Sequence, residues 1–182
     1  MLVSSDGCDF GETAPGFTLP DALGATHALR DLMGENGVLV AFICNHCPYV
    51  IDVMPRLVAD IPALEEAGIG VVCINANDHV AYPADAPDKM PAFAARFGLS
   101  VPYLFDETQQ VARAYGAVCT PDFLGFGRET GLQYRGRLDD VPMRGDPAGR
   151  NPELLRAMQM VARTGKGPDG QTASMGCSLK WK

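Results

Sequence analysis

The feature that most constrains this chain is a Cys-x-x-Cys pair between an apolar strand and a helix. Residues 38–43 (Val-Leu-Val-Ala-Phe-Ile) are continuously apolar, as expected for a parallel strand buried on both faces. Cys44 and Cys47 of a Cys-Asn-His-Cys motif follow directly. Pro48 comes next and is well suited to the first turn of a helix. This order places two thiols at a helix N-terminus.

Two thiols at this spacing and this end of a helix are suited to disulfide exchange. The unpaired N–H groups of a helix N-terminus stabilise a thiolate, so we expect the pKa of Cys44 to fall below the ~8.5 of a free thiol. Cys47, one helical turn away, can then close a disulfide and release a mixed-disulfide intermediate. Asn45 and His46 support the pair. A protonated His46 would make the disulfide more oxidising; the alternative is a solvated histidine.

A second segment, Cys119-Thr120-Pro121, is predicted to belong to the same site. It lies between a predicted helix at residues 107–115 and a predicted hairpin at residues 123–135. A proline entering a strand at such a point is a candidate for a cis peptide bond, so we predict that Thr120–Pro121 is cis and lies beside the redox pair. Because proline has no N–H group, we also expect a free strand edge there that can receive an extended substrate.

The rest of the chain alternates strand-like and helix-like segments, which predicts an α/β fold. A length of 182 residues fits one domain spanning residues 1–182. Its core covers about residues 10–163, and residues 164–182 form a C-terminal tail. The further expected elements are a hairpin at 17–29, a helix from 48 to 67 that kinks or breaks at Pro55 and Pro62, a strand at 69–74, a polar loop at 75–87, a helix at 88–97, an extended piece at 102–105 and a helix at 151–163.

Charge and hydropathy argue against two classes of partner. The net charge is −7, and no run of Lys or Arg indicates a nucleic-acid or anionic-membrane footprint. No apolar stretch approaches the ~20 residues of a membrane span. The first ten residues have neither a basic nor an apolar region, so we expect no signal peptide and a cytoplasmic protein. In a reducing cytosol, its six cysteines are not expected to form a structural disulfide framework.

The order of these segments resembles the thioredoxin superfamily: strand, Cys-x-x-Cys, long helix, strand, Thr-Pro, hairpin and last helix. The N-terminal hairpin and a segment inserted at about residues 75–117 resemble the redoxin branch, the alkyl hydroperoxide reductase/thiol-specific antioxidant superfamily. Residues 42–50, 115–122 and 175–182 resemble a group of bacterial thioredoxin-family proteins. The resemblance implies a thioredoxin-like fold: a central mixed sheet flanked by helices, with an N-terminal hairpin and an insertion before the Thr-Pro segment.

The resemblance also implies an activity, that of a thiol–disulfide oxidoreductase with a redox-active disulfide and no bound cofactor. Cys44 would be the attacking thiol, Cys47 the resolving thiol and Pro121 the cis-proline. Its partners would be protein or small-molecule thiols and disulfides, together with a reducing partner such as a thioredoxin or glutathione system.

The alternative within the same class is a peroxiredoxin-like thiol peroxidase with an antioxidant role. Peroxiredoxins carry a proline and a Thr or Ser shortly before the peroxidatic cysteine, whereas residues 38–43 contain neither. We therefore predict that hydrogen peroxide is a poor substrate. Thioredoxins carry a tryptophan before the first cysteine and a buried acid in the preceding strand. Here Ile43 replaces the tryptophan, and residues 38–43 contain no acid.

A different class is a metal-binding protein of thioredoxin fold. Soft ligands for Zn or Cu(I) could converge from the Cys-x-x-Cys region and the two later cysteines, namely Cys44, His46, Cys47, Cys119 and Cys177. A Cys-x-x-Cys pair without a second matching pair is a weak zinc signal, so we assign no metal to the chain.

Cys119 and Cys177 are the two candidate redox partners of the pair. Leu179 and Trp181 are apolar anchors at the chain terminus, which suggests that the tail docks rather than hangs free. We predict that it folds back and brings Cys177 toward the redox pair and Cys119; the alternative is that Trp181 packs elsewhere and Cys177 is idle. Cys73 is expected to be inert core, and no role is expected for Cys8.

Overall fold

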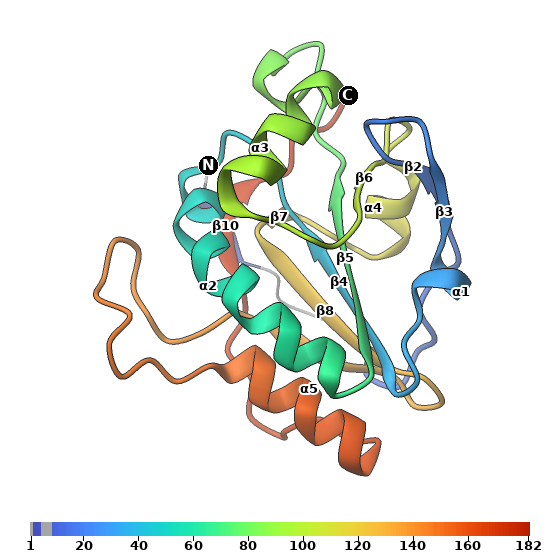
Figure 1. Ribbon diagram of the computed structural model, residues 1–182, viewed down its shortest axis with the longest axis vertical. Coiled ribbons are helices and arrows are strands. Elements are labelled where there is room, and N and C mark those ends of the chain that lie inside the picture. Colours follow the sequence, from blue (N-terminus) through green and yellow to red (C-terminus); the bar gives the residue numbers. More distant parts are fainter. Residues whose placement is uncertain (1, 5–8) are drawn as a thin grey trace.

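The computed structural model describes residues 2–4 and 9–182, so Cys8 lies outside the described residues (Figure 1). A five-stranded sheet with the order β6–β5–β4–β8–β9 forms its centre. Strands β4, β5 and β6 are parallel, whereas β8 and β9 run antiparallel to their neighbours. The bounds are β4 Gly37–Phe42, β5 Ile69–Asn75, β6 Tyr103–Phe105, β8 Asp122–Gly127 and β9 Gly131–Gly136. The predicted mixed sheet is confirmed.

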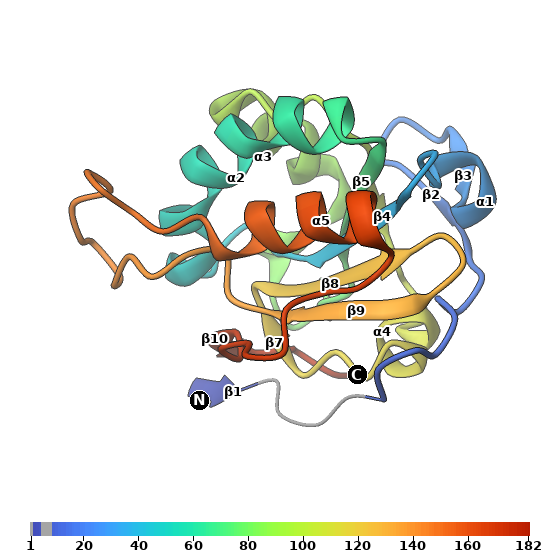
Figure 2. The same cartoon turned by 90° about the horizontal axis from the view of Figure 1, so that it is seen from below.

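Alternation along β4 gives this sheet two apolar faces. Leu39, Ala41 and Ile43 pack on one side with α2 (Pro48–Glu66), α3 (Met90–Phe97) and α5 (Glu153–Thr164). The intervening Val38, Val40 and Phe42 pack on the other side, where α4 (Gln110–Ala114) lies. Figure 2 shows α2, α3 and α5 above the sheet and α4 below it. Helices thus flank the sheet on both faces, as expected.

Shorter elements complete the structure. The predicted N-terminal hairpin is present as β2 (Thr18–Pro20) and β3 (Thr26–Ala28), and α1 (Leu29–Leu32) follows it. Two 3₁₀ turns, η1 (Pro83–Asp85) and η2 (Pro87–Lys89), lie in the segment predicted as a polar loop. This segment joins β5 to α3 and proves important for the site.

Helix α2 differs from the prediction, because it runs as one element through Pro55 and Pro62. Both prolines lie on its exposed side, where water can satisfy the carbonyl groups that lose their helical partner. The opposite side is held in the core by Val50, Met54, Leu57, Ile61 and Leu64. Packing along this face keeps the helix continuous where local propensity predicted a break.

The C-terminal tail also differs, because residues Met175–Ser178 form a strand, β10, that lies between two others. It pairs with β1 (Leu2–Ser4) and with β7 (Cys119–Thr120), both antiparallel. Cys177 lies opposite Thr120 in the second pair. The prediction of a free strand edge beside Pro121 is therefore wrong at this side, since the chain's own C-terminus occupies it.

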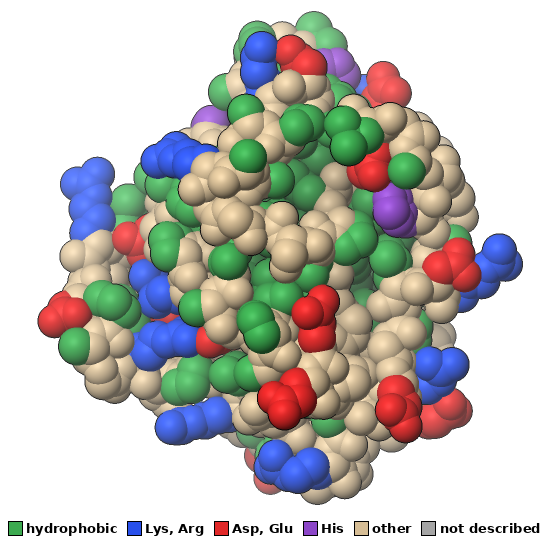
Figure 3. All heavy atoms as spheres, in the orientation of Figure 1, with side chains coloured by type: hydrophobic (Ala, Val, Ile, Leu, Met, Phe, Trp, Pro, Cys, Tyr) green, Lys and Arg blue, Asp and Glu red, His purple; other side chains and the backbone are tan. Residues whose placement is uncertain are grey.

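The surface carries charges of both signs. On the face shown in Figure 3, acidic and basic side chains are both spread around the molecule, with hydrophobic side chains between them. Within the described ranges, no helix has the length and apolar character that crossing a bilayer requires.

Candidate redox site

The redox pair lies where β4 ends and α2 begins. Cys47 is the N-cap residue of α2, and Pro48 occupies the first helical position. Both thiols are deeply buried, with Cys44 1% and Cys47 0% exposed. The predicted strand, Cys-x-x-Cys and helix start are thus found in their expected order.

Thr120 contacts both cysteines from β7. Its Oγ1 lies 3.3 Å from Cys44 Sγ, and its carbonyl oxygen accepts a hydrogen bond of 3.2 Å from the Cys47 thiol. The Thr120–Pro121 peptide bond is cis, as predicted. The Thr-Pro segment therefore lies directly against the redox pair, and Thr120 has a more direct contact with the thiols than the sequence indicated.

The pKa values of the two thiols are shifted in opposite directions. Hydrogen bonding to the Cys44 thiol lowers the pKa of Cys47 to about 5, against an opposing effect of burial, and the amide of Val50 and Cys177 add to the lowering. The same bond to Cys47 raises the pKa of Cys44, and burial and the charge of Asp85 raise it further. These pKa directions run against the expectation that Cys44 is the low-pKa thiol, because Cys47 occupies the N-cap and Cys44 faces a carboxylate.

That carboxylate belongs to Asp85, a residue that the sequence did not single out. Asp85 is 0% exposed and lies in η1, at the end of the segment that follows β5. Its carboxylate accepts hydrogen bonds from the Asn45 backbone N–H (2.8 Å) and the Asn77 amide (2.7 Å), and it pairs with His46 Nδ1 at 2.6 Å. A buried acid is therefore present beside the pair, although it comes from the insertion rather than from β4.

Asn45 and His46 are both held by side chains from beyond α2. The Tyr103 hydroxyl donates a hydrogen bond of 2.9 Å to Asn45 Oδ1. The His46 ring stacks on Tyr82, with centroids 5.6 Å apart and planes 8° apart. Because His46 Nδ1 faces Asp85, any positive charge on this ring lies beside a carboxylate. The carboxylate offsets that charge, so we expect His46 to stabilise a thiolate of the pair less than an unpaired histidine would.

The C-terminal strand brings a third thiol to the pair, as predicted. Cys177 lies opposite Thr120 and packs against the core cluster that contains Cys44 and Cys47. Burial raises the pKa of Cys177, and its interaction with Cys47 raises it further. Leu179 is buried and its N–H donates to the Val118 carbonyl at 2.9 Å. Trp181 is 37% exposed and lies under the Arg113 guanidinium at 4.2 Å. The tail is thus docked mainly through Leu179 and its backbone.

The remaining described cysteines are turned to other surroundings. Cys119 is buried and its thiol donates to the Pro121 carbonyl at 3.6 Å. Burial raises the pKa of Cys119, and likewise that of Cys73 in β5, to about 12. Both thiols are therefore held in the protonated form. Cys73 lies in the core, as expected. Cys119 lies next to Thr120, but the hydrogen bond of its thiol goes to Pro121 and not to Cys44 or Cys47.

The donor set that comes nearest to a metal centre is Cys44, His46 and Asp85. One ligand atom from each lies within 4.8 Å of the other two. Thiolate, imidazole and carboxylate are all zinc ligands. However, His46 and Asp85 are bonded to each other at 2.6 Å, which is too close for two ligands on one tetrahedral ion. The arrangement as folded is an ion pair beside a thiol, and we assign no metal to it.

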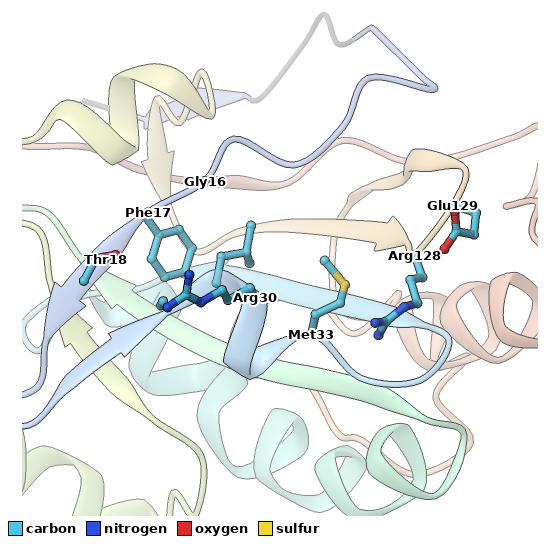
Figure 4. Close-up of a pocket in the computed structure, with 9 residues that line it drawn as sticks. Gly16, Phe17, Thr18, Arg30, Met33, Arg128 and Glu129 are labelled. Atoms are coloured by element: carbon cyan, nitrogen blue, oxygen red, sulfur yellow. The ribbon is translucent and has the colours of Figure 1, made fainter.

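Two cavities differ in their relation to the thiols. A hollow of about 710 Å³ lies between the N-terminal hairpin, α1 and the β8–β9 turn, lined by Phe17, Arg30, Met33 and Arg128 (Figure 4). It lies at the opposite end of β4 from Cys44. A smaller one, of about 290 Å³, adjoins Pro121 and the first turns of α2. The second is the nearer of the two to the pair, through Pro121 and Tyr49, although neither Cys44 nor Cys47 lines it.

Comparison with known proteins identifies the family. The sequence profile of the AhpC/TSA family matches residues 10–138. The chain belongs to the AhpC/TSA family. Like solved proteins of thioredoxin-like fold at 19–20% identity, it has a mixed sheet flanked by helices. The predicted redoxin branch and thioredoxin-like fold are confirmed.

The relatives of this AhpC/TSA chain include a protein named as a thiol-disulfide oxidoreductase and one named as a peroxiredoxin. A crystal structure of an uncharacterized conserved protein from Geobacillus kaustophilus is 39% identical, with a TM-score of 0.91 over 100% of this chain and 97% of that one. Thiol-disulfide oxidoreductase ResA of Geobacillus thermodenitrificans is 34% identical over 106 residues, 58% of this chain and 56% of that protein. A Mycobacterium tuberculosis protein named as a peroxiredoxin is 30% identical over 107 residues, 59% of this chain and 63% of that protein. The chain thus matches little more than half the length of ResA.

Proposed function

We propose that this AhpC/TSA protein is a thiol–disulfide oxidoreductase that exchanges disulfides through Cys44 and Cys47. The observation that carries the proposal is the buried thiol pair at the N-terminus of α2, with both thiols in contact with Thr120 of the cis Thr120–Pro121 bond. A helix N-terminus and a neighbouring thiol both favour a thiolate in such a pair. Attack on a disulfide and closure of Cys44–Cys47 then complete the exchange.

The surroundings support disulfide exchange over peroxide reduction. Residues 38–43 provide neither the proline nor the Thr or Ser of a peroxidatic site, and the hydroxyl near Cys44 comes instead from Thr120 in β7.

The cavity beside Pro121 favours substrates with an apolar group next to the disulfide. Its walls include Tyr49, Val53, Phe123 and Met143. One side is supported by ion pairs from α2 to the β9–α5 segment, including Arg56 Nε to Asp139 at 2.8 Å. A peptide side chain bound there would place a neighbouring disulfide close to the pair. We propose a thioredoxin or glutathione system as the reducing partner, in the cytoplasm.

Trapping with glutathione disulfide tests the activity. Attack by Cys44 predicts that Cys47→Ser accumulates a glutathione adduct on Cys44, whereas the unsubstituted protein proceeds to a Cys44–Cys47 disulfide and releases two glutathiones. Peptide mapping by mass spectrometry reads both products. Cys73→Ser, a change in the core of β5, is the matched control and should behave like the unsubstituted protein. Failure of the unsubstituted protein to form the Cys44–Cys47 disulfide would contradict the proposal.

A further inference from the structure

Three cysteines meet around Thr120. The Cys47 thiol donates to the Thr120 carbonyl at 3.2 Å, and Cys44 Sγ lies 3.3 Å from Thr120 Oγ1. Cys177 lies opposite Thr120 in the β7–β10 pair and packs against the core cluster that contains both other thiols. Of these three, Cys44 and Cys47 are deeply buried, and Cys177 is the partly exposed one. A disulfide formed between Cys44 and Cys47 would therefore be shielded from solvent, with Cys177 as its more accessible neighbour.

The C-terminal strand is built to hold Cys177 in this place. Its backbone pairs with β7 so that Cys177 lies opposite Thr120, the residue whose carbonyl contacts the Cys47 thiol. Gly176 permits the approach, because a Cβ at this position would lie 2.1 Å from the Thr120 carbonyl oxygen. Beyond the strand, the Lys180 N–H donates to Asn77 Oδ1 at 2.8 Å. The chain is thus held by the pairing of β10 with β7 and by the contact of Lys180 just beyond it. Figure 1 shows β10 beside β7, close to the start of α2.

The position of β10 beside Pro121 is one that an extended substrate could occupy. In β10, the residue opposite Thr120 is Cys177, and this side chain packs against the core cluster that contains the redox pair. The protein's own C-terminus therefore offers a thiol to Cys47 in the manner of a bound disulfide substrate.

We propose that Cys177 is a third redox thiol, which exchanges with the Cys44–Cys47 disulfide through Cys47. In this step the Cys177 thiolate attacks Cys47 Sγ, the Cys44–Cys47 bond breaks, and a Cys47–Cys177 disulfide forms. Cys44 leaves as a thiolate and takes up a proton, so two electrons pass from Cys177 to Cys44. The partly exposed Cys177 sulfur is then open to attack by an external dithiol, which restores the three thiols and becomes a disulfide. This role rests on the proposed exchange at Cys44 and Cys47.

Removal of Cys44 isolates the proposed bond. In Cys44→Ser, mild oxidation with diamide should give a Cys47–Cys177 disulfide, mapped by mass spectrometry of a non-reducing digest. Its yield should exceed that of any Cys47–Cys119 or Cys119–Cys177 disulfide at least tenfold. A dominant bond to Cys119, or recovery of Cys47 and Cys177 as free thiols, would overturn the proposal. Cys177→Ser separates the two claims, since it should still form Cys44–Cys47; if it does not, the proposed function fails.

Displacement of β10 gives a second test without loss of any thiol. Gly176→Val, combined with Cys44→Ser, places side-chain atoms against the Thr120 carbonyl and should reduce the Cys47–Cys177 yield at least tenfold. Gly170→Val in the same background is the matched control, because a Cβ at Gly170 meets nothing within 4 Å. Circular dichroism should show that both variants remain folded. An unchanged yield in a folded Gly176→Val variant would contradict the role assigned to β10.

Discussion

At the scale of single residues, Asp85 and Cys47 determine the chemistry of the pair. Cys47 gains the N-cap position of α2, while the Asp85 carboxylate lies within 4.8 Å of Cys44. The negative charge opposes a second one on Cys44, which raises the pKa of that thiol. Residues 38–43 contain no acid, and the carboxylate near Cys44 comes instead from Asp85 in η1.

Asp85→Asn is predicted to make Cys44 more reactive. Two charges about 5 Å apart interact by roughly 3 kcal/mol at an effective dielectric of ~20, so the pKa of Cys44 should fall by roughly 2 when the charge is removed. The rate of iodoacetamide labelling against pH, measured in a Cys47→Ser background, reads this value. Asp52→Asn, which alters a carboxylate paired with Arg56 on α2, is the control. An equal or higher pKa in Asp85→Asn would refute the electrostatic role of Asp85.

Hydrogen peroxide is predicted to oxidise the reduced protein slowly. Residues 38–43 lack the proline and the Thr or Ser that organise a peroxidatic site. Stopped-flow fluorescence or timed alkylation measures the rate constant beside a dedicated peroxidase. A value within tenfold of that peroxidase would favour the peroxiredoxin reading instead.

Sequence reasoning identified the motif residues but could not identify Asp85. Cys44, Cys47, Thr120 and Pro121 carry local signals: an apolar run, a helix start and an X-Pro step. Asp85 lies in a polar segment that also contains other aspartates, and nothing local distinguishes it. Its role depends on how the chain after β5 folds over the start of α2, which is a tertiary contact with no sequence signature of its own.

At the scale of elements, β10 is the part that sequence patterns missed. Met175-Gly-Cys-Ser contains no β-branched or aromatic residue and alternates poorly, so local propensity indicates a loop. The strand forms because β1 and β7 both pair with it and because Leu179 anchors its end. Docking of the tail was nevertheless predictable, since an apolar chain end without a partner is unfavourable.

Leu179→Ala is predicted to destabilise the fold and Met175→Ala is not. Leu179 is 3% exposed, and truncation of a buried leucine costs about 2–4 kcal/mol in the free energy of unfolding. Met175, at the start of the same strand, is 55% exposed, so its truncation should change that free energy by less than ~0.5 kcal/mol. Urea denaturation measures both. Equal effects would show that the tail is not anchored through Leu179.

At the scale of the whole molecule, several thiol and phenol groups are buried in the folded protein. Burial raises the pKa of Cys73 and Cys119 to about 12 and also raises that of Tyr115 and Tyr134. A group whose pKa is higher in the folded than in the unfolded state contributes stability below its unfolded pKa. That contribution is lost as the pH rises through the folded value.

The free energy of unfolding is therefore predicted to decrease between about pH 9 and pH 12. Each such thiol contributes a slope of about 1.4 kcal/mol per pH unit in this range. Cys73→Ala removes one titrating group and should make the slope shallower by about that amount, whatever its effect on stability at pH 7. Urea denaturation at a series of pH values measures the slope; an unchanged slope in Cys73→Ala would show that Cys73 does not titrate as proposed.

The fold as a whole was accessible from the sequence because its signals reinforce one another. The buried run of β4, the helix start at Pro48 and the β8–β9 hairpin each carry a local pattern, and their order admits few topologies. The path of α2 through Pro55 and Pro62 was not accessible, because it depends on packing of the opposite helix face against the sheet.

The central claim is that Cys44 and Cys47 interconvert between dithiol and disulfide as a two-electron pair. Equilibration of the protein across a series of glutathione redox buffers, followed by acid quenching and mass mapping, tests it most directly. The account predicts one transition with two-electron dependence, in which the Cys44–Cys47 disulfide appears, and its loss in Cys47→Ser. Absence of the Cys44–Cys47 disulfide at every buffer ratio, or an unchanged transition in Cys47→Ser, would contradict it.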